Sequence, residues 1–196
     1  MHPLSLMLFA LLWLAIIYLL NSIIAQGWKK IEPKQALVYF FTVALIGVFG
    51  ELFLDTAYNY FVGHPLWRYE ILPIHNAYTS TGAVVVWGLY GLHLYLLHGT
   101  LGSKWSINKT RHLALIFSVE ALVFEALLTI SAKLLLGKFV YYYIPGDLWH
   151  VTSIQNLPFY LICGFLILGT LKRFRKEPLF FSGMSALLLL VVVFFI

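Results

Sequence analysis

Hydrophobic residues dominate six long runs of this chain, and polar residues are confined mainly to the short segments between them. Each run has about the twenty residues that a helix needs to cross the hydrocarbon core of a bilayer. The pattern therefore predicts transmembrane helices over residues 3–25, 35–60, 79–100, 112–136, 153–171 and 178–196. We expect an all-α, polytopic integral membrane protein that forms a single transmembrane domain over residues 1–196.

The composition fits such a protein. Hydrophobic residues make up 61% of the 196 positions and charged residues 11%, and the mean hydropathy is +0.88. A water-soluble domain of this length could not bury so much apolar surface, whereas a bilayer accommodates it. The net charge of +5 is divided among short basic clusters between the apolar runs, so we expect no nucleic-acid partner. Cys163 is the one cysteine in the sequence, which excludes an intrachain disulfide.

The basic residues also predict how the chain is oriented in the membrane. Ten of the thirteen Lys and Arg residues fall in the first, third and fifth loops between the predicted spans, and two fall in the second and fourth. By the positive-inside rule, the three basic loops face the cytoplasm. The sequence therefore predicts a multi-pass protein of the cell membrane with its N- and C-termini outside. The second and fourth loops, which are rich in aromatic residues, would also face outward.

A diverged internal repeat links the two aromatic loops and the helices that flank them. When Glu51 is aligned with Glu125, a glycine follows twelve residues later and a tyrosine eighteen residues later in both copies. Further pairs appear when a gap of one or two residues is allowed: Pro73 with Pro145, His75 with His150, and Thr79-Ser80 with Thr152-Ser153. We expect two tandem repeat units, over about residues 35–100 and 112–171. Each unit holds two spans, so an axis near the membrane normal would relate them.

Acidic residues inside the predicted helices mark the candidate site. The four are Glu51, Asp55, Glu120 and Glu125. An ionisable group at such a depth is costly unless it is paired, solvated or neutral, and it indicates a functional site by default. Glu51, Asp55 and Asn59 are four residues apart and form one stripe on their helix, and Glu125, Thr129 and Lys133 have the same spacing.

We expect Glu51 and Glu125 to face each other across a polar cavity, with Lys133 close enough to neutralise Glu125. The candidate catalytic residues are Glu51, Glu125, Asp55, His75 and His150. The candidate substrate-binding residues are Asn59, Trp67, Tyr69, Tyr143, Trp149 and Lys133. Histidine and glutamate together could bind zinc, but the sequence has no HxxH, HExxH or CxxC spacing, so we expect no metal and no other cofactor. For His93, deep in the third span, we expect a hydrogen bond to a neighbouring side chain.

One stretch of the chain resembles a family of small membrane proteins. It comprises Glu51, Asn59, Gly63, Leu66-Trp67-Arg68-Tyr69, Pro73, Ser80 and Trp87-Gly88. These residues are similar to the signature of the type-IV ABC-transporter family of small polytopic proteins, which have a glutamate in a helix and then W-x-Y and a proline before the next helix. The resemblance covers about forty of the 196 residues and implies a role in transport. Arg68 stands where an acidic residue is usual in that family.

The same region is similar to the membrane-embedded lycopene cyclases and meroterpenoid cyclases. Those enzymes also have duplicated helical units, intramembrane carboxylates, W-x-Y and a motif led by a proline. This resemblance implies an enzyme that acts on a lipid or an isoprenoid. After that proline, the lycopene cyclases have acidic residues where this chain has Ile74-His75-Asn76.

The sequence leaves three functions open. The first is a permease-like or transport-accessory protein whose carboxylates bind a proton or a cation. The second is a membrane enzyme in which the two glutamates act on a lipid or isoprenoid by acid/base catalysis. In the third, a structural subunit, the glutamates only join helices by hydrogen bonds and the aromatic loops form an interfacial belt. The expected partners are membrane lipid, a hydrophobic small molecule or ion as substrate, and a second copy of the chain or a partner subunit.

Overall fold

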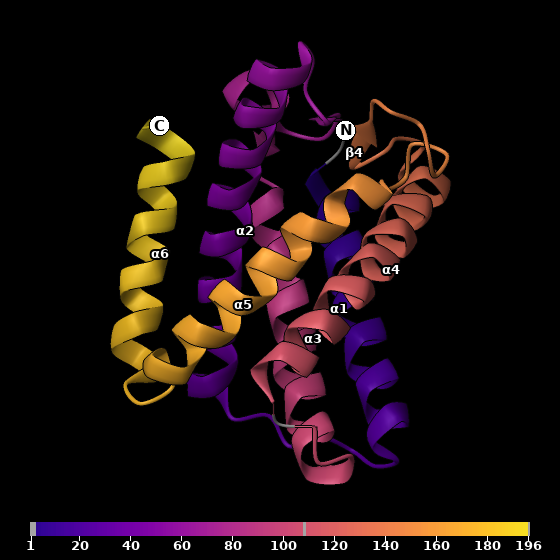
Figure 1. Cartoon of the computed structure of the whole chain (residues 1–196). Helices are drawn as coiled ribbons and strands as arrows, with labels where there is room; N and C mark the ends of the chain where they lie inside the picture. The colour runs from indigo at the N-terminus through magenta and orange to yellow at the C-terminus, as the bar shows by residue number, and fades with distance from the viewer. Residues whose placement is uncertain (1–2, 108, 196) are drawn as a thin grey trace.

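Six long helices build the protein (Figure 1). The computed structural model describes residues 3–107 and 109–195. The helices are α1 (Pro3–Ala25), α2 (Pro33–Val62), α3 (Ala83–Lys104), α4 (Thr110–Leu136), α5 (Leu157–Phe174) and α6 (Pro178–Phe195). All six are long and apolar enough to cross a membrane. This agrees with the all-α, multi-pass architecture predicted from the sequence.

Helix α2 lies at the centre of the bundle. It contacts α3, α5 and α6, while α4 packs against α5 and α1 against α3. Both ends of the chain lie at the same end of the bundle as strand β4, and the turns that join α1 to α2, α3 to α4 and α5 to α6 lie at the other end (Figure 1). The three basic loops therefore share one end of the molecule. That this end faces the cytoplasm stays a prediction.

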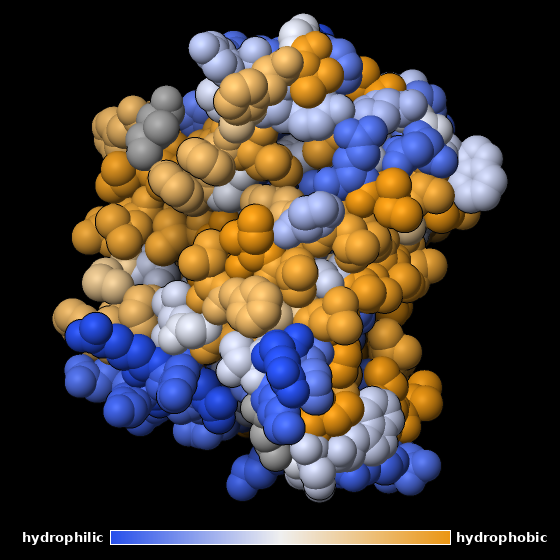
Figure 2. All heavy atoms as spheres, viewed as in Figure 1, coloured by the Kyte–Doolittle hydropathy of each residue, from blue (hydrophilic) through white to orange (hydrophobic). Residues whose placement is uncertain are grey.

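The outside of the bundle is apolar over its middle. On the face shown in Figure 2, hydrophobic residues cover the central part and hydrophilic residues gather at both ends. Large apolar side chains such as Phe53, Leu134 and Ile162 are exposed on the helices. Such a continuous apolar surface is unfavourable in water and is accommodated by lipid acyl chains.

Short strands order the two aromatic loops, which the sequence pattern did not predict. The elements are β1 (Trp67–Tyr69), β2 (Pro73–Ile74), β3 (Thr79–Ser80), β4 (Tyr141–Tyr143) and the 3₁₀ turns η1 (His75–Ala77) and η2 (Ile154–Asn156). Strands β1 and β4 pair antiparallel, with Trp67 opposite Tyr143 and Tyr69 opposite Tyr141. Strands β2 and β3 form a second small antiparallel pair. The β1–β4 ladder joins one aromatic loop to the other.

Helices α3 and α5 begin later than the hydrophobic pattern predicted. The expected starts were residues 79 and 153, whereas the helices begin at Ala83 and Leu157. The reason lies in the two threonines that precede them. Thr79 is in β3 and Thr152 in a β-bridge, and both side chains are buried and hydrogen-bonded to a glutamate. Because the backbone is extended at each threonine, the hydroxyl points into the bundle. The first helical turn therefore begins only after the threonine.

Helices α2 and α4, which carry the two glutamates, end in the same way. Each is followed by a glycine in the left-handed conformation, Gly63 with φ +86° and Gly137 with φ +73°. The Gly63 N–H donates to the main-chain oxygen of Asn59, and the Gly137 N–H donates to the main-chain oxygen of Lys133. Only glycine adopts this conformation readily. The two glycines therefore fix where the chain leaves each helix and enters an aromatic loop.

The contact between α2 and α3 is unusually close. At Gly47, an added Cβ would lie 2.1 Å from the Trp87 ring, and at Gly91 it would lie 2.6 Å from the main-chain oxygen of Tyr39. Glycines at such contacts let two helix backbones approach each other within a membrane. At Gly47, the free space is occupied by the indole of Trp87, which is thereby directed toward the candidate site.

Candidate functional site

Glu51 is buried in the middle of the bundle and accepts three side-chain hydrogen bonds. Its Oε1 accepts from the Tyr69 hydroxyl and, at 2.7 Å, from Trp87 Nε1. Its Oε2 accepts from Thr79 Oγ1 at 2.5 Å. Only 5% of Glu51 is exposed. Three neutral donors therefore take the place of the water that would otherwise solvate this carboxyl group.

Glu125 is held in a closely similar way on α4. Its Oε1 accepts from the Tyr143 hydroxyl at 2.6 Å, and its Oε2 accepts from the Thr152 hydroxyl. Asn156 Nδ2 in turn donates to the Tyr143 hydroxyl and, at 3.1 Å, to the Tyr160 hydroxyl. Glu125 is 6% exposed, so it is as deeply buried as Glu51.

The donors occupy matching places in the chain. In both sets, the tyrosine follows the glutamate by 18 residues, and the threonine follows it by 28 residues after Glu51 and 27 after Glu125. The β1–β4 ladder brings the two sets together, because Tyr69 and Tyr143 lie on the paired strands. Their rings pack against aromatic partners across the ladder, Tyr69 on Tyr141 at 5.2 Å and Trp67 on Tyr143 at 5.7 Å between centroids.

Both glutamates line the same two small cavities. Their volumes are about 10 Å³ and 30 Å³. Space of this size holds on the order of one or two water molecules. The walls are largely aromatic, with contributions from Trp67, Tyr69, Trp87, Tyr90, Phe124, Tyr141, Tyr143, Phe159 and Tyr160. We refer to Glu51, Glu125 and these walls as the carboxyl site.

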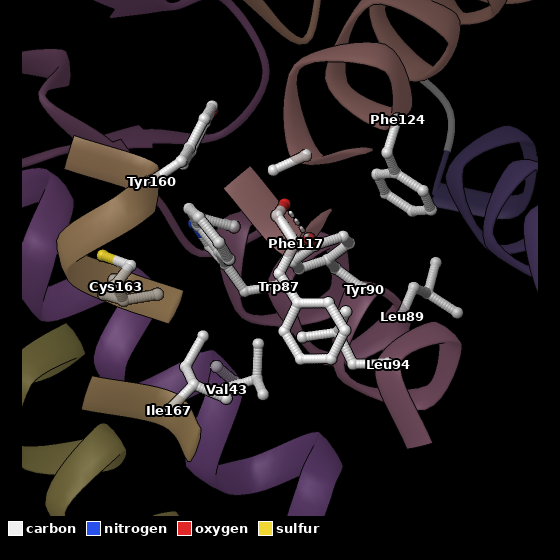
Figure 3. Packing of buried hydrophobic residues seen from close by; sticks show 14 of the residues in the cluster. Val43, Trp87, Leu89, Tyr90, Leu94, Phe117, Phe124, Tyr160, Cys163 and Ile167 are labelled. Atoms are coloured by element: carbon white, nitrogen blue, oxygen red, sulfur yellow. Dashed lines mark hydrogen bonds between the residues drawn. The ribbon is translucent and has the colours of Figure 1, made fainter. Parts of the chain in front are cut away.

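Figure 3 shows part of one wall. The Trp87 ring lies between Tyr160 of α5 and Tyr90 of α3, and Phe124 of α4 lies beyond Tyr90. Ring centroids are 6.0 Å apart for Trp87 and Tyr90, and 6.1 Å apart for Trp87 and Tyr160. Helices α3, α4 and α5 therefore all present aromatic faces to the two glutamates.

The carboxyl site contains no cationic side chain. Within residues 3–107 and 109–195, no Lys or Arg forms an ion pair with Glu51 or Glu125. Lys133, expected to neutralise Glu125, is exposed, and its ammonium group lies 4.6 Å from the centre of the Phe139 ring. Burial and then the adjacent glutamates raise the pKa of Tyr69 and Tyr143 well above the usual 10.0. Both phenols therefore stay neutral hydrogen-bond donors.

Asp55 has a different place from the one predicted. It is fully buried one helical turn beyond Glu51, but it does not line either cavity. Its Oδ1 accepts from the main-chain N–H groups of Leu66 at 2.5 Å and Trp67 at 3.4 Å. Asp55 thus ties the start of β1 to α2. Asn59, one turn further on, is half-buried and also lies outside the cavities.

The structure does not bring the two predicted loop histidines to the glutamates. His75 Nε2 lies 3.1 Å from the main-chain oxygen of Val192 on α6. The His150 ring stacks on Tyr142, with 4.2 Å between centroids, and its Nδ1 lies 2.5 Å from the oxygen of Tyr143. Trp149 is 83% exposed. In the described part of the chain, no three His, Cys, Asp or Glu residues form a group that could hold a metal ion.

Some residues of the site were not among the sequence candidates. They are Thr79, Trp87, Tyr141, Thr152, Asn156 and Tyr160. The pairing of Thr79 with Thr152 in the repeat alignment was the signal for two of them, but the same pairing also selected His75 with His150. Sequence spacing could not decide which pair turns inward.

Comparison with protein-family models, curated proteins and solved structures gives no match to this chain. The chemistry of the carboxyl site therefore rests on its geometry. Two buried carboxyl groups, neutral donors on each, aromatic walls and a water-sized space can bind and release a proton. They offer no cationic group for an anionic ligand.

Proposed function

We propose that this integral membrane protein is an acid/base enzyme for an unsaturated, lipid-soluble substrate of the isoprenoid class. The observation that carries the proposal is the pair of glutamates, each buried, each bound by neutral donors, and both within one aromatic shell. Two carboxylates cannot both be charged at low cost in such surroundings without a cation. The pair therefore holds a proton that Glu51 or Glu125 can donate, while the other carboxylate accepts one.

The route to the site supports a lipid-soluble substrate. An apolar groove of about 350 Å³ runs between α1, α3 and α4 at the end of the bundle nearer the aromatic loops. Val86 lines this groove and also the 30 Å³ cavity on the glutamates. Other lining residues include Met7, Leu89 and Leu128. A chain-like apolar molecule in this groove would approach the carboxyl site past Val86.

The aromatic walls suit the intermediate that protonation would create. Addition of a proton to a carbon–carbon double bond leaves a carbocation. The faces of Trp87, Tyr90, Phe124 and Tyr160 attract a cation by cation–π interactions, most strongly where water is excluded. Loss of a different proton to the second carboxylate would restore a double bond. Transfer of that proton back to the first glutamate, through the water-sized cavities that both line, would regenerate the protein.

Proton-coupled transport is a second candidate, and one observation favours it. The two cavities at the glutamates have room for water, which can carry a proton to and from the carboxyl groups. A permease for a polar solute would need a polar path, whereas the groove that leads to the site is apolar. Lipid-soluble substrates therefore fit the geometry better than water-soluble ones.

We also propose that α2–α3 and α4–α5 are the two units of an internal repeat. The support comes from matching contacts: a glutamate bound by a tyrosine and a threonine in each unit, and a left-handed glycine at the end of each first helix. The central pair of the β1–β4 ladder, Arg68 with Tyr142, would then lie on the axis that relates the units. Superposition of residues 35–100 on 112–171 tests this.

The enzyme proposal is tested by deuterium incorporation. The purified protein in liposomes is incubated in heavy water with linear polyprenes, and products are analysed by mass spectrometry. Proton transfer to a double bond should introduce deuterium and change the number of rings or the positions of the double bonds. Glu51→Gln and Glu125→Gln should each lower turnover by roughly a hundredfold or more, the usual contribution of a general acid or base.

Asp55→Asn is the matched control, because it makes the same acid-to-amide change one turn away on α2. An asparagine oxygen can still accept from the N–H groups of Leu66 and Trp67, so turnover should be retained. Turnover that survives both glutamate substitutions would contradict the proposal. Proton flux across the same liposomes that depends on Glu51, without any deuterated product, would favour transport instead.

A further inference from the structure

A second polar cluster lies apart from the carboxyl site, in the wall of another groove. This groove has a volume of about 430 Å³ and lies between α1, α3 and α4, on the side nearer the α3–α4 turn. Its lining is apolar and aromatic except for His93 and Glu120. Trp13 stands at one end, where its Nε1 donates to Ser131 Oγ at 3.0 Å and its ring packs on Phe124.

The hydrogen bond between Asn21 and His93 determines which ring nitrogen of His93 accepts. Asn21 Nδ2 donates to the main-chain oxygen of Ile17 at 2.9 Å, and the same nitrogen lies 2.8 Å from His93 Nδ1. Because a side-chain oxygen in that place would face the Ile17 oxygen, the amide orientation is determined and His93 Nδ1 must accept. The proton of the neutral ring is then on Nε2, which lies 2.9 Å from Glu120 Oε1 without the geometry of a hydrogen bond. The bond to Asn21 agrees with the hydrogen-bonding role expected for His93.

Glu120 therefore lies beside a neutral imidazole, and no Lys or Arg among the described residues forms an ion pair with it. Its side chain is 25% exposed, and it lines the groove. The Tyr90 hydroxyl lies near Glu120 but donates to the main-chain oxygen of Phe117 at 2.8 Å. Lys104, the last residue of α3, does not line the groove. Its Nζ donates to the main-chain oxygen of Ile24 at 3.4 Å. A carboxylate with only a neutral imidazole beside it leaves a negative charge in apolar surroundings.

We propose that this groove binds a lipophilic organic cation, with Glu120 as its counter-ion. Charge complementarity is the first reason, since Glu120 is the one acidic side chain of the lining and no lysine or arginine of the described chain lines the groove with it. The rings of Trp13, Trp105 and Phe124 are the second, because aromatic faces attract cations. An acyl chain would fill the space but would leave the carboxylate uncompensated.

The site favours a cation whose charge is spread over an apolar body. A compact ammonium ion would need several acceptors to replace its hydration shell, and the groove offers a single carboxylate with aromatic rings. A tetra-aryl phosphonium ion has no N–H groups to satisfy and presents an apolar surface. The proposal does not depend on the enzyme function, because Glu51 and Glu125 do not line this groove.

Binding of tetraphenylphosphonium to the purified protein in nanodiscs, measured by calorimetry, tests the proposal. Tetraphenylborate is the control ligand, since it has the same shape and the opposite charge. The phosphonium should bind and the borate should not. Glu120→Gln should weaken phosphonium binding by roughly thirtyfold or more, the loss expected when one partner of a buried charge pair is removed. Glu51→Gln should leave the affinity unchanged.

A second variant keeps the test independent of how well Glu120→Gln folds. Leu127 lines the groove and is exposed on α4, so Leu127→Trp should narrow the groove while Glu120 stays in place. Weaker phosphonium binding is expected. Equal affinity for the two ions, unchanged phosphonium affinity in both groove variants, or a loss of binding in Glu51→Gln alone would each overturn the proposal.

Discussion

At the scale of single residues, two threonine hydroxyls complete the hydrogen bonding of the buried glutamates. Thr79 and Thr152 each donate to the Oε2 atom of a glutamate, and each is almost fully buried. For Glu51, no other donor to Oε2 is found among residues 3–107 and 109–195. A carboxyl oxygen that loses its donor at this depth has no water to replace it.

We therefore predict that Thr79→Val and Thr152→Val each destabilise the protein by about 1–3 kcal/mol, the cost of an unsatisfied buried polar group. Valine keeps the branched shape, so the loss reports the hydroxyl alone. The apparent unfolding temperature in detergent is the measurement. Thr56→Val, at an exposed position of α2, is the control and should have little effect. Unfolding temperatures equal to the control would show that these hydroxyls do not support the glutamates.

The glutamates and tyrosines could be predicted from the sequence, but the loop residues beside them could not. Paired spacing identified Glu51, Glu125, Tyr69 and Tyr143, and all four line the site. The path of each loop depends instead on left-handed backbone at non-glycine residues, including His75 and Trp149. Residue type alone rarely predicts that conformation. It directs the histidines away from the glutamates and the threonines toward them.

At the scale of the helices, Gly47 of α2 sets the position of Trp87. An added methyl group would lie within 2.5 Å of three atoms of the indole, so the ring would have to move. Its Nε1 lies 2.7 Å from Glu51, and any displacement weakens that hydrogen bond. The contact between two helices is thus coupled directly to the carboxyl site.

Gly47→Ala should destabilise the protein by about 1–3 kcal/mol, as overpacking of a close contact does. Detergent unfolding and Trp fluorescence would both report the change. Gly99→Ala on α3 is matched to it, since an added Cβ there meets nothing within 4 Å. The control should be neutral or stabilise by up to about 1 kcal/mol through helix propensity. If Gly47→Ala and Gly99→Ala change the stability equally, Gly47 does not fix the position of the Trp87 indole.

The helices themselves were the most predictable part of the structure. An apolar run of about twenty residues satisfies its backbone only as a helix in lipid, so the hydrophobic pattern is decisive there. The starts of α3 and α5 were wrong by about four residues because Thr79 and Thr152 turn inward before each helix begins. The β1–β4 pairing was missed altogether, since it joins residues more than seventy positions apart.

At the scale of the whole molecule, the charge distribution predicts which end faces the cytoplasm. The basic loops lie at one end, and the aromatic loops and both termini lie at the other (Figure 1). Lys104→Cys should therefore be protected from a membrane-impermeant maleimide in intact cells, and Arg68→Cys should react. Both positions are exposed, and the native Cys163 is buried, which limits background labelling. If the cysteine at position 104 were labelled and the cysteine at position 68 were not, the predicted orientation would be wrong.

The hydrogen bonds of each glutamate are also local in the sequence, which bears on how the protein is made. The three donors to Glu51 lie within the next 36 residues, and the tyrosine and threonine that donate to Glu125 lie within the next 27. A ribosome delivers Tyr69, Thr79 and Trp87 to the insertion machinery before Glu125 has been synthesised. The first carboxyl group can thus be shielded as its helical hairpin enters the bilayer, without waiting for the second. The β1–β4 ladder joins the two hairpins, each of which carries a tyrosine and a threonine that donate to its own glutamate.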